Sequence, residues 1–268
     1  MASFSHRMPL GNKVHMMNLV FVFMMILVSI VGVFPATANA AKVCDKTIYL
    51  SFDTGNMSVA QFVADTLRKH QVVATFFLAN EKTFRGDLAL DESWKPFWQS
   101  MVADGHAFGS HTLNHTYFQK DGKNNEVVLK SQFGPNAGKA FNADQLEVCH
   151  QIKSVDPVFN QLTGSHLQKI WRAPGGKISP RLIQMAKACG YQHIGWSDTG
   201  FLGDELSSAQ YSNQFLLQKA LEQLKDGDIA MAHLGIWSRK DAWATGVLEP
   251  LIVGLKQKGF CFATVSSQ

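Results

Sequence analysis

The sequence predicts an α/β protein built on a parallel β-sheet. Short apolar runs, which are typical of strands, alternate along the chain with stretches of helical periodicity, and seven strands are expected. Repeated β–α units imply parallel strands joined by right-handed crossovers. An open doubly wound sheet and a closed barrel both fit this order, and the length favours a single domain.

The first half of the chain alternates between strand and helix signals. The apolar run 47–52 predicts a buried strand, and residues 58–70 predict a helix whose first residue, a serine, can cap it. The β-branched and aromatic residues of 72–79 predict a second strand. A helix over 93–105, ended by glycine, and a short strand over 106–111 follow.

The second half begins with a change in composition. The polar, glycine-containing stretch 117–142 predicts a long loop or a small insertion, and 143–164 predicts a helix bent before Pro157. Strands and helices then alternate to the end. The strands are expected at 168–172, 192–197, 228–233 and 260–265, and the helices at 179–190, 208–225 and 244–258.

The first forty residues differ from the rest. Two basic residues precede an apolar run from Leu19 to Phe34, and Ala38-Asn39-Ala40 follows. This pattern predicts a signal peptide over 1–40 and a mature domain over 41–268, in an exported, periplasmic or extracellular protein. An uncleaved membrane anchor is the competing interpretation, because the run is nearly long enough to span a bilayer.

The charge of the remaining chain is small. Residues 1–40 contain two of the 25 Lys and Arg and none of the 21 Asp and Glu, so their removal lowers the net charge from +4 to +2 (23 minus 21). Such a weak excess gives no case for nucleic acid as a partner. None of the four cysteines lies in a C-x-x-C pair, so the spacing does not indicate a zinc knuckle or a redox motif.

Polar residues gather where the expected strands end. In parallel α/β architectures the carboxyl ends of the strands form the active site. His111 and His115, four residues apart, would lie on one face of a helical turn and could bind one metal. The strand-end residues are Asp53, His111, His115, Arg172, Asp198 and His233.

Two Asp-Thr-Gly triplets, at 53–55 and 198–200, suggest an aspartic protease, in which paired carboxylates share a proton. Proteases of that kind are built almost wholly of β-strands. Here each triplet lies where a strand gives way to a βα loop, so we expect no pairing of these two aspartates.

In their order and spacing the motifs resemble those of the polysaccharide deacetylase (NodB-homology) domain, carbohydrate esterase family 4. The resemblance covers nearly all of 46–265 and implies a distorted (β/α)7 barrel. The motifs are Ser51-Phe52-Asp53-Thr54, His111-Thr112-Leu113-Asn114-His115, Arg172-Ala173-Pro174-Gly175-Gly176, Trp196-Ser197-Asp198 and Met231-Ala232-His233.

The resemblance implies hydrolysis of the N-acetyl amide of an amino sugar in a glycan such as peptidoglycan or chitin. It makes Asp53 the general base, which Arg172 orients. It makes His233 the general acid, with Asp198 keeping it cationic. It assigns a divalent metal, usually zinc, to His111 and His115.

The resemblance also assigns substrate contacts. The backbone N–H of Gly175 would stabilise the oxyanion. Tyrosine is common where Gly175 stands, so a lower groove wall is expected there. Trp237 is the best candidate for stacking on a sugar ring, with Trp196 and Trp243 as alternatives.

The chain departs from the family pattern at Thr54. The second aspartate of the first motif is normally the third metal ligand, and a neutral hydroxyl is a poorer one. Weak metal binding, recruitment of Asp53 and a metal-free site all remain open. A hydrolase of another C–N bond and an inactive carbohydrate-binding protein are therefore the alternative functions.

In a closed barrel the first and last strands are neighbours, which makes a Cys44–Cys261 disulfide feasible. Cys149 and Cys189 lie on successive expected helices and form the second candidate pair. Four buried free thiols are the alternative.

Overall fold

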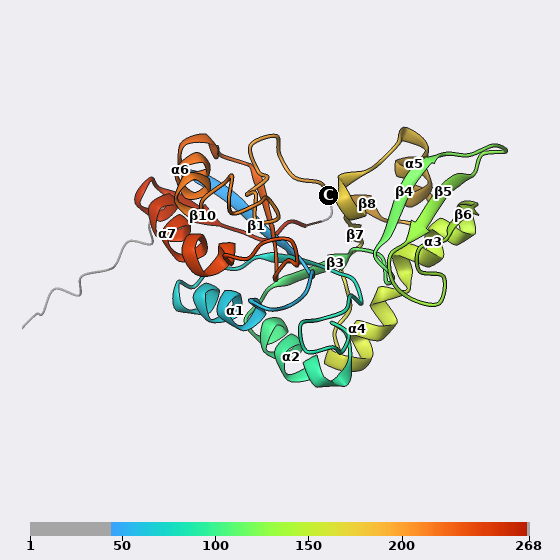
Figure 1. Ribbon diagram of the computed structural model, residues 1–268, viewed down its shortest axis with the longest axis horizontal. Coiled ribbons are helices and arrows are strands. Elements are labelled where there is room, and N and C mark those ends of the chain that lie inside the picture. Colours follow the sequence, from blue (N-terminus) through green and yellow to red (C-terminus); the bar gives the residue numbers. More distant parts are fainter. Residues whose placement is uncertain (1–43, 267–268) are drawn as a thin grey trace, which may run out of the picture. The chain divides into compact units, whose positions relative to one another are not determined.

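The computed structural model describes residues 44–266, and its main elements alternate between strand and helix (Figure 1). The strands of the main sheet are β1 (Lys46–Asp53), β2 (Thr75–Leu78), β3 (Ala107–Ser110), β7 (Ile170–Trp171), β8 (Gln192–His193), β9 (Ile229–His233) and β10 (Phe260–Phe262). The helices are α1 (Ala60–Lys69), α2 (Lys95–Ala103), α3 (Gln145–Lys153), α4 (Val155–Thr163), α5 (Pro180–Ala188), α6 (Asn213–Gln223) and α7 (Trp243–Gln257), with short 3₁₀ turns η1 (Glu92–Trp94) and η2 (Pro174–Gly176).

The seven main strands form one parallel sheet. Its order is β10-β1-β2-β3-β7-β8, and β9 also pairs with β1. The predicted α/β class and its seven parallel strands are therefore confirmed. The described residues belong to one compact unit, and the expected signal peptide over 1–40 lies outside them. Within the described residues, no helix combines the length and the apolar character needed to cross a membrane.

Strand β1 pairs with three other strands, β2, β9 and β10. Its register places Asp53 beside Phe77 of β2 and beside His233 of β9. Ile48, Leu50 and Phe52 point to the face of β1 opposite to that of Asp53. They are buried in the main hydrophobic core with α1, α2 and α7. The alternation fixes the face of β1 on which the carboxylate of Asp53 lies.

The stretch 117–142, which was expected to be a long loop or a small insertion, is an inserted antiparallel sheet, so the second alternative holds. Its strands are β4 (Thr116–Asp121), β5 (Val127–Ser131) and β6 (Ala140–Ala143), in the order β4-β5-β6. Phe118, Val127 and Leu129 lie on the buried face of these strands and pack against α3 and α5 in a second hydrophobic cluster. The predictive signal was weak because glycines interrupt these short runs.

The helix expected over 143–164 is two helices. Asp144 caps α3 by accepting a hydrogen bond from Glu147 N at 2.9 Å, and α4 begins at Val155. Pro157 lies in the first turn of α4, where a proline is tolerated because its missing N–H would have no helical partner. The break at Ser154 thus lies before Pro157, as expected, although it separates two helices instead of bending one.

The last strand, β10, ends at Phe262 and does not extend to residue 265 as expected. Val265 N donates to Thr75 Oγ1 at 2.8 Å. The Val265 side chain packs with Phe77, Ile170 and Ile194 in a third apolar cluster. Val265 thus adds to the apolar packing between β2, β7 and the chain after β8.

Both expected disulfides are present. Cys44 bonds Cys261 with a Cα–Cα distance of 5.7 Å, and Cys149 bonds Cys189 at 5.4 Å. The first joins the chain before β1 to β10, whose residues pair in parallel register. The second joins α3 to the end of α5, which supports the antiparallel insertion.

Removing the second bridge should weaken the domain. We expect Cys149→Ser/Cys189→Ser to lower the free energy of unfolding by about 2–4 kcal/mol, because the bridge closes a long loop in the unfolded chain. Urea denaturation of the variant and the wild-type protein measures this. Reductant should destabilise the wild-type protein more than the double substitution does, because it opens both bridges. If neither the substitution nor the reductant changed the stability, the bridge would be contradicted.

Candidate active site

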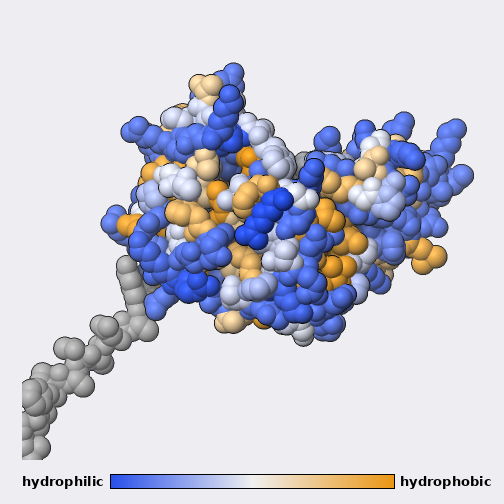
Figure 2. All heavy atoms as spheres, turned by 60° about the horizontal axis from the view of Figure 1, so that its bottom comes forward, coloured by the Kyte–Doolittle hydropathy of each residue, from blue (hydrophilic) through white to orange (hydrophobic). Residues whose placement is uncertain are grey.

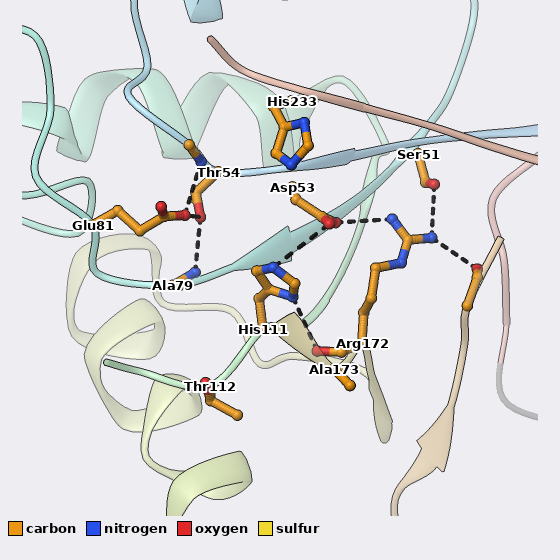
Figure 3. Close-up of polar contacts among 12 residues, drawn as sticks. Ser51, Asp53, Thr54, Ala79, Glu81, His111, Thr112, Arg172, Ala173 and His233 are labelled. Atoms are coloured by element: carbon orange, nitrogen blue, oxygen red, sulfur yellow. Dashed lines mark hydrogen bonds and ion pairs between the residues drawn. The ribbon is translucent and has the colours of Figure 1, made fainter. Parts of the chain in front are cut away.

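The site is built around a buried ion pair at the carboxyl end of β1. Arg172 is fully buried, and its Nη1 lies 2.8 Å from Asp53 Oδ1 (Figure 3). The remaining guanidinium donors reach Ser51 Oγ and the carbonyls of Ile194 and Gly195, and the group lies over the Phe77 ring. Each side of the guanidinium is therefore held in place.

The ion pair controls the charge of Asp53. Burial alone would raise the pKa of Asp53, but Arg172 and His233 oppose it and bring the pKa below its usual value. Asp53 is therefore an ionised carboxylate at neutral pH. Its Oδ1 faces Arg172, and its Oδ2 faces His111.

His111 and His115 come together through a tight turn, not through the helical turn that was expected. Thr112 (φ 61°) and His115 (φ 47°) both adopt left-handed backbone, and the two rings lie 4.8 Å apart between centroids. His111 Nδ1 lies 2.9 Å from the Arg172 carbonyl. Because a carbonyl only accepts, Nδ1 carries the proton and Nε2 presents a lone pair to Asp53.

The electrostatics of His111 suit a metal ligand. Burial lowers the pKa of His111 to about 4, although Asp53 opposes this shift. The imidazole is therefore neutral at neutral pH, and metal binding requires this form. The backbone carbonyl that fixes its tautomer plays the orienting role that is common beside ligating histidines.

Thr54 is engaged elsewhere. Its hydroxyl donates to Glu81 Oε1 at 2.7 Å and accepts from Ala79 N at 3.1 Å (Figure 3). Glu81 Oε1 also accepts from Gly55 N at 2.9 Å. The doubtful ligand role of Thr54 finds no support in this arrangement, because both the donor and an acceptor position of its hydroxyl are occupied. Glu81, a buried carboxylate after β2, was missed by the sequence analysis.

The donor set fits a cation only in part. Among residues 44–266, no group of three or more His, Cys, Asp or Glu is already arranged to hold a metal. However, His111 Nε2 and Asp53 Oδ2 lie 3.5 Å apart, close to the about 3.4 Å that separates two ligands of one tetrahedral zinc. His115 adds a buried Nδ1 that has no hydrogen-bond partner. The imidazoles of His111 and His115, with Asp53 beside them, thus have the chemistry to bind a divalent cation.

His233 pairs with Asp204, not with Asp198. His233 Nδ1 lies 3.1 Å from Asp204 Oδ2, and the same carboxylate accepts from His233 N. Burial alone would lower the pKa of His233, but Asp204 outweighs it and raises the pKa to about 10. Asp198 is exposed, so its expected pairing with His233 is corrected to Asp204.

The reason for this correction is the length of strand β8. It ends at His193, and the chain then turns until Phe201 forms a parallel bridge with Met231 of β9. The carboxylate at the sheet edge is therefore the one that follows this second contact, Asp204. The short apolar pair Phe201-Leu202 before Gly203-Asp204 was the only sequence signal for it.

The predicted substrate residues lie at different depths. Gly175 is exposed in η2 with φ 63°, a conformation that favours glycine, and its N–H stays a prediction for oxyanion contact. Trp237 is 65% exposed and also stays a prediction. The Trp196 ring lies 5.8 Å from Arg172 Cζ, measured from the ring centroid. Trp243 is buried in α7 and is not available for sugar stacking.

Comparisons with known proteins agree with this geometry. The family model for polysaccharide deacetylases matches residues 40–194. The chain is 27% identical over 82% of its length to the peptidoglycan-N-acetylmuramic acid deacetylase PdaA of Bacillus subtilis, of which it covers 70%. It is 24% identical over 80% of its length to the chitooligosaccharide deacetylase of Azorhizobium caulinodans, of which it covers 90%.

Solved structures share the fold. One is a family 4 acetyl xylan esterase from Clostridium thermocellum with a cobalt ion, with a TM-score of 0.59, 20% identity, and coverage of 82% of this chain and 88% of that one. Another is a CE4 family pseudoenzyme from Bacillus anthracis, with a TM-score of 0.58 and 18% identity. The match covers 82% of this chain and 64% of the pseudoenzyme chain.

The resemblance that the motifs predicted is confirmed, together with its barrel fold. The expected class of enzyme, a hydrolase of C–N bonds outside peptides, agrees with the names of the two deacetylases. The family model matches more than half of the chain. The matched residues include Asp53, His111 and Arg172, and this match assigns the family. The chain belongs to the polysaccharide deacetylase family.

Proposed function

We propose that this protein is an exported, metal-assisted deacetylase that hydrolyses the N-acetyl amide of amino sugars in a peptidoglycan- or chitin-like glycan and releases acetate. The observation that carries the proposal is the pairing of Asp53 with His233 across β1 and β9. One strand end presents a base and its neighbour presents an acid, as amide hydrolysis requires.

Asp53 acts on the attacking water. Arg172 occupies Oδ1, so Oδ2 is the oxygen that remains free to take the proton. The water oxygen then adds to the acetyl carbon, and the N–H of Gly175 faces the developing oxyanion. The buried Arg172 keeps the carboxylate charged and fixes its direction.

His233 acts on the leaving group. With a pKa raised to about 10, its imidazole is protonated at neutral pH. As the C–N bond breaks, the proton passes from His233 to the amine nitrogen, so that acetate and a free amino sugar are the products. Asp204 stabilises the charged imidazole before the transfer.

Zinc is the metal that we propose for His111 and His115, next to the free Oδ2 oxygen of Asp53. A divalent cation there would polarise the acetyl carbonyl and acidify its bound water. The neutral imidazole of His111 and the unpartnered nitrogen of His115 support this assignment. Because Thr54 is bonded to Glu81, we expect weaker binding than in a site with three preset ligands.

The alternatives are less well supported. The intact set of Asp53, Arg172, His233 and its partner Asp204 speaks against an inactive carbohydrate-binding protein. A hydrolase of another C–N bond would need the same acid and base, so only substrate tests separate it from a deacetylase.

Acetate release tests the function directly. We expect the wild-type protein to release acetate from peptidoglycan or from chitooligosaccharide, and chelator to reduce the rate. Asp53→Asn should lower kcat by about 10²-fold or more, because the amide cannot accept the proton. Absence of acetate from both glycans, with zinc supplied, would reject the deacetylase proposal.

Replacing the partner of His233 should shift the pH dependence. In Asp204→Asn the largest of the charges that oppose the burial effect is lost, so the pKa of His233 falls. The wild-type acid is protonated at pH values below about 10. We expect kcat of the variant at pH 8 to fall about 10²-fold and to recover partly at lower pH.

The control for this prediction is Asp198→Asn, which removes the exposed carboxylate that does not contact His233. Its pH–kcat profile should match that of the wild-type protein. Equal profiles for Asp204→Asn and the wild-type protein would contradict the assigned pair.

Restoring an aspartate at residue 54 should require a second change. In Thr54→Asp the new carboxylate meets Glu81, so we expect lower stability and no gain in zinc affinity. In Thr54→Asp/Glu81→Gln the amide can donate to the new carboxylate, and zinc affinity should rise about tenfold. Calorimetric zinc titration measures both, with Glu81→Gln as the control. Equal affinities for the double variant and the wild-type protein would count against this account.

A further inference from the structure

The strand that leaves the second motif places a tyrosine at the mouth of the site. Thr116 and Phe118 point toward α3. Thr116 Oγ1 lies 2.8 Å from Gln151 Oε1, and Phe118 belongs to the second hydrophobic cluster. Because side chains alternate along a strand, Tyr117 points to the opposite face. It is half-buried, and no hydrogen bond to its hydroxyl is found among the described residues.

Tyr117 contacts two predicted site residues. Its ring lies edge-on to the His115 ring, with centroids 4.8 Å apart and planes at 86°. A Cβ placed on Gly175 would lie 3.0 Å from Tyr117 Cε1. The ring therefore occupies the space above Gly175, and the lower groove wall that was expected there is corrected.

The hydrophobic and hydrophilic character of the surface does not by itself locate a sugar site. Figure 2 shows one face of the molecule, where hydrophobic side chains reach the surface in separate patches among hydrophilic ones. A half-exposed aromatic ring beside His115 and Gly175 is more specific evidence, because carbohydrate rings stack on aromatic faces and hydrogen-bond to hydroxyl groups.

We propose that Tyr117 is a substrate-contacting residue that determines specificity: its ring forms the wall against which the amino sugar packs, and its hydroxyl donates to a polar group of the glycan. This inference rests on the proposed function. The antiparallel insertion β4-β5-β6 thus supplies a part of the site from outside the barrel. Gly175 is a glycine because of its left-handed backbone and because Tyr117 fills the adjoining space.

Sugar binding without turnover tests the proposal. Calorimetry with N-acetylated chitotetraose, in the absence of added metal, measures Kd for the wild-type protein and its variants. We expect Tyr117→Ala to raise Kd about two- to tenfold, through loss of the stacking surface. Tyr117→Phe keeps the ring and should raise Kd by a smaller factor, about two- to fivefold, through loss of the hydroxyl.

A matched control is Tyr211, an exposed tyrosine whose ring contacts Phe215. Tyr211→Ala should leave Kd unchanged. Melting temperature and zinc affinity are measured for every variant. If Tyr117→Ala lowers these two values and leaves Kd unchanged, the residue is only structural and the proposal is overturned. It is also overturned if the wild-type protein does not bind the sugar.

A double-mutant cycle tests the contact with Gly175. Gly175→Ala should weaken sugar binding more in the wild-type background than in Tyr117→Ala, because only the wild-type background adds a clash with the ring. Additive effects would contradict the contact. Sugar binding that depends on Tyr117, without acetate release under any metal condition, would refute the deacetylase function and leave this inference standing.

Discussion

The buried ion pair between Asp53 and Arg172 is the interaction on which the rest of the site depends. Two charges removed from water persist only when geometry and further hydrogen bonds compensate for their desolvation. Here the guanidinium meets a carboxylate, the Ser51 hydroxyl and two carbonyls, and it rests on the ring of Phe77. These partners come from β1, β2 and the chain after β8, so the pair forms only when the parallel sheet has assembled around it.

A second constraint concerns the number of carboxylates near the imidazoles. The family pattern has an aspartate at residue 54, whereas this chain has Thr54 and places Glu81 against it at 2.7 Å. A carboxylate is thus present, but it is used to hold the loop after β1 through Thr54 and Gly55. The site thus keeps a carboxyl group next to residue 54, but this group is engaged by the loop and not directed at the imidazoles.

Much of the fold and part of the site could be predicted from the sequence. Asp53, Arg172 and His233 follow strands with clear apolar patterns, so their common edge could be inferred without coordinates. Asp204 and Glu81 could not, because their positions depend on contacts between distant segments, such as the bridge from Phe201 to Met231. The sheet β4-β5-β6 was missed for a different reason: its strands are short, and tertiary packing against α3 compensates for weak local signals.

The position of β1 has a consequence for how the protein is made. This strand pairs with β2 soon after it in the chain, but its other partners are β9 and β10, and Lys46 lies opposite Phe260. A nascent chain that emerges from the ribosome therefore exposes the edge of its first strand until nearly all of its residues have been synthesised. Such long-range pairing slows folding, so the carboxylate of Asp53 stays accessible until the last strands of the sheet have been added.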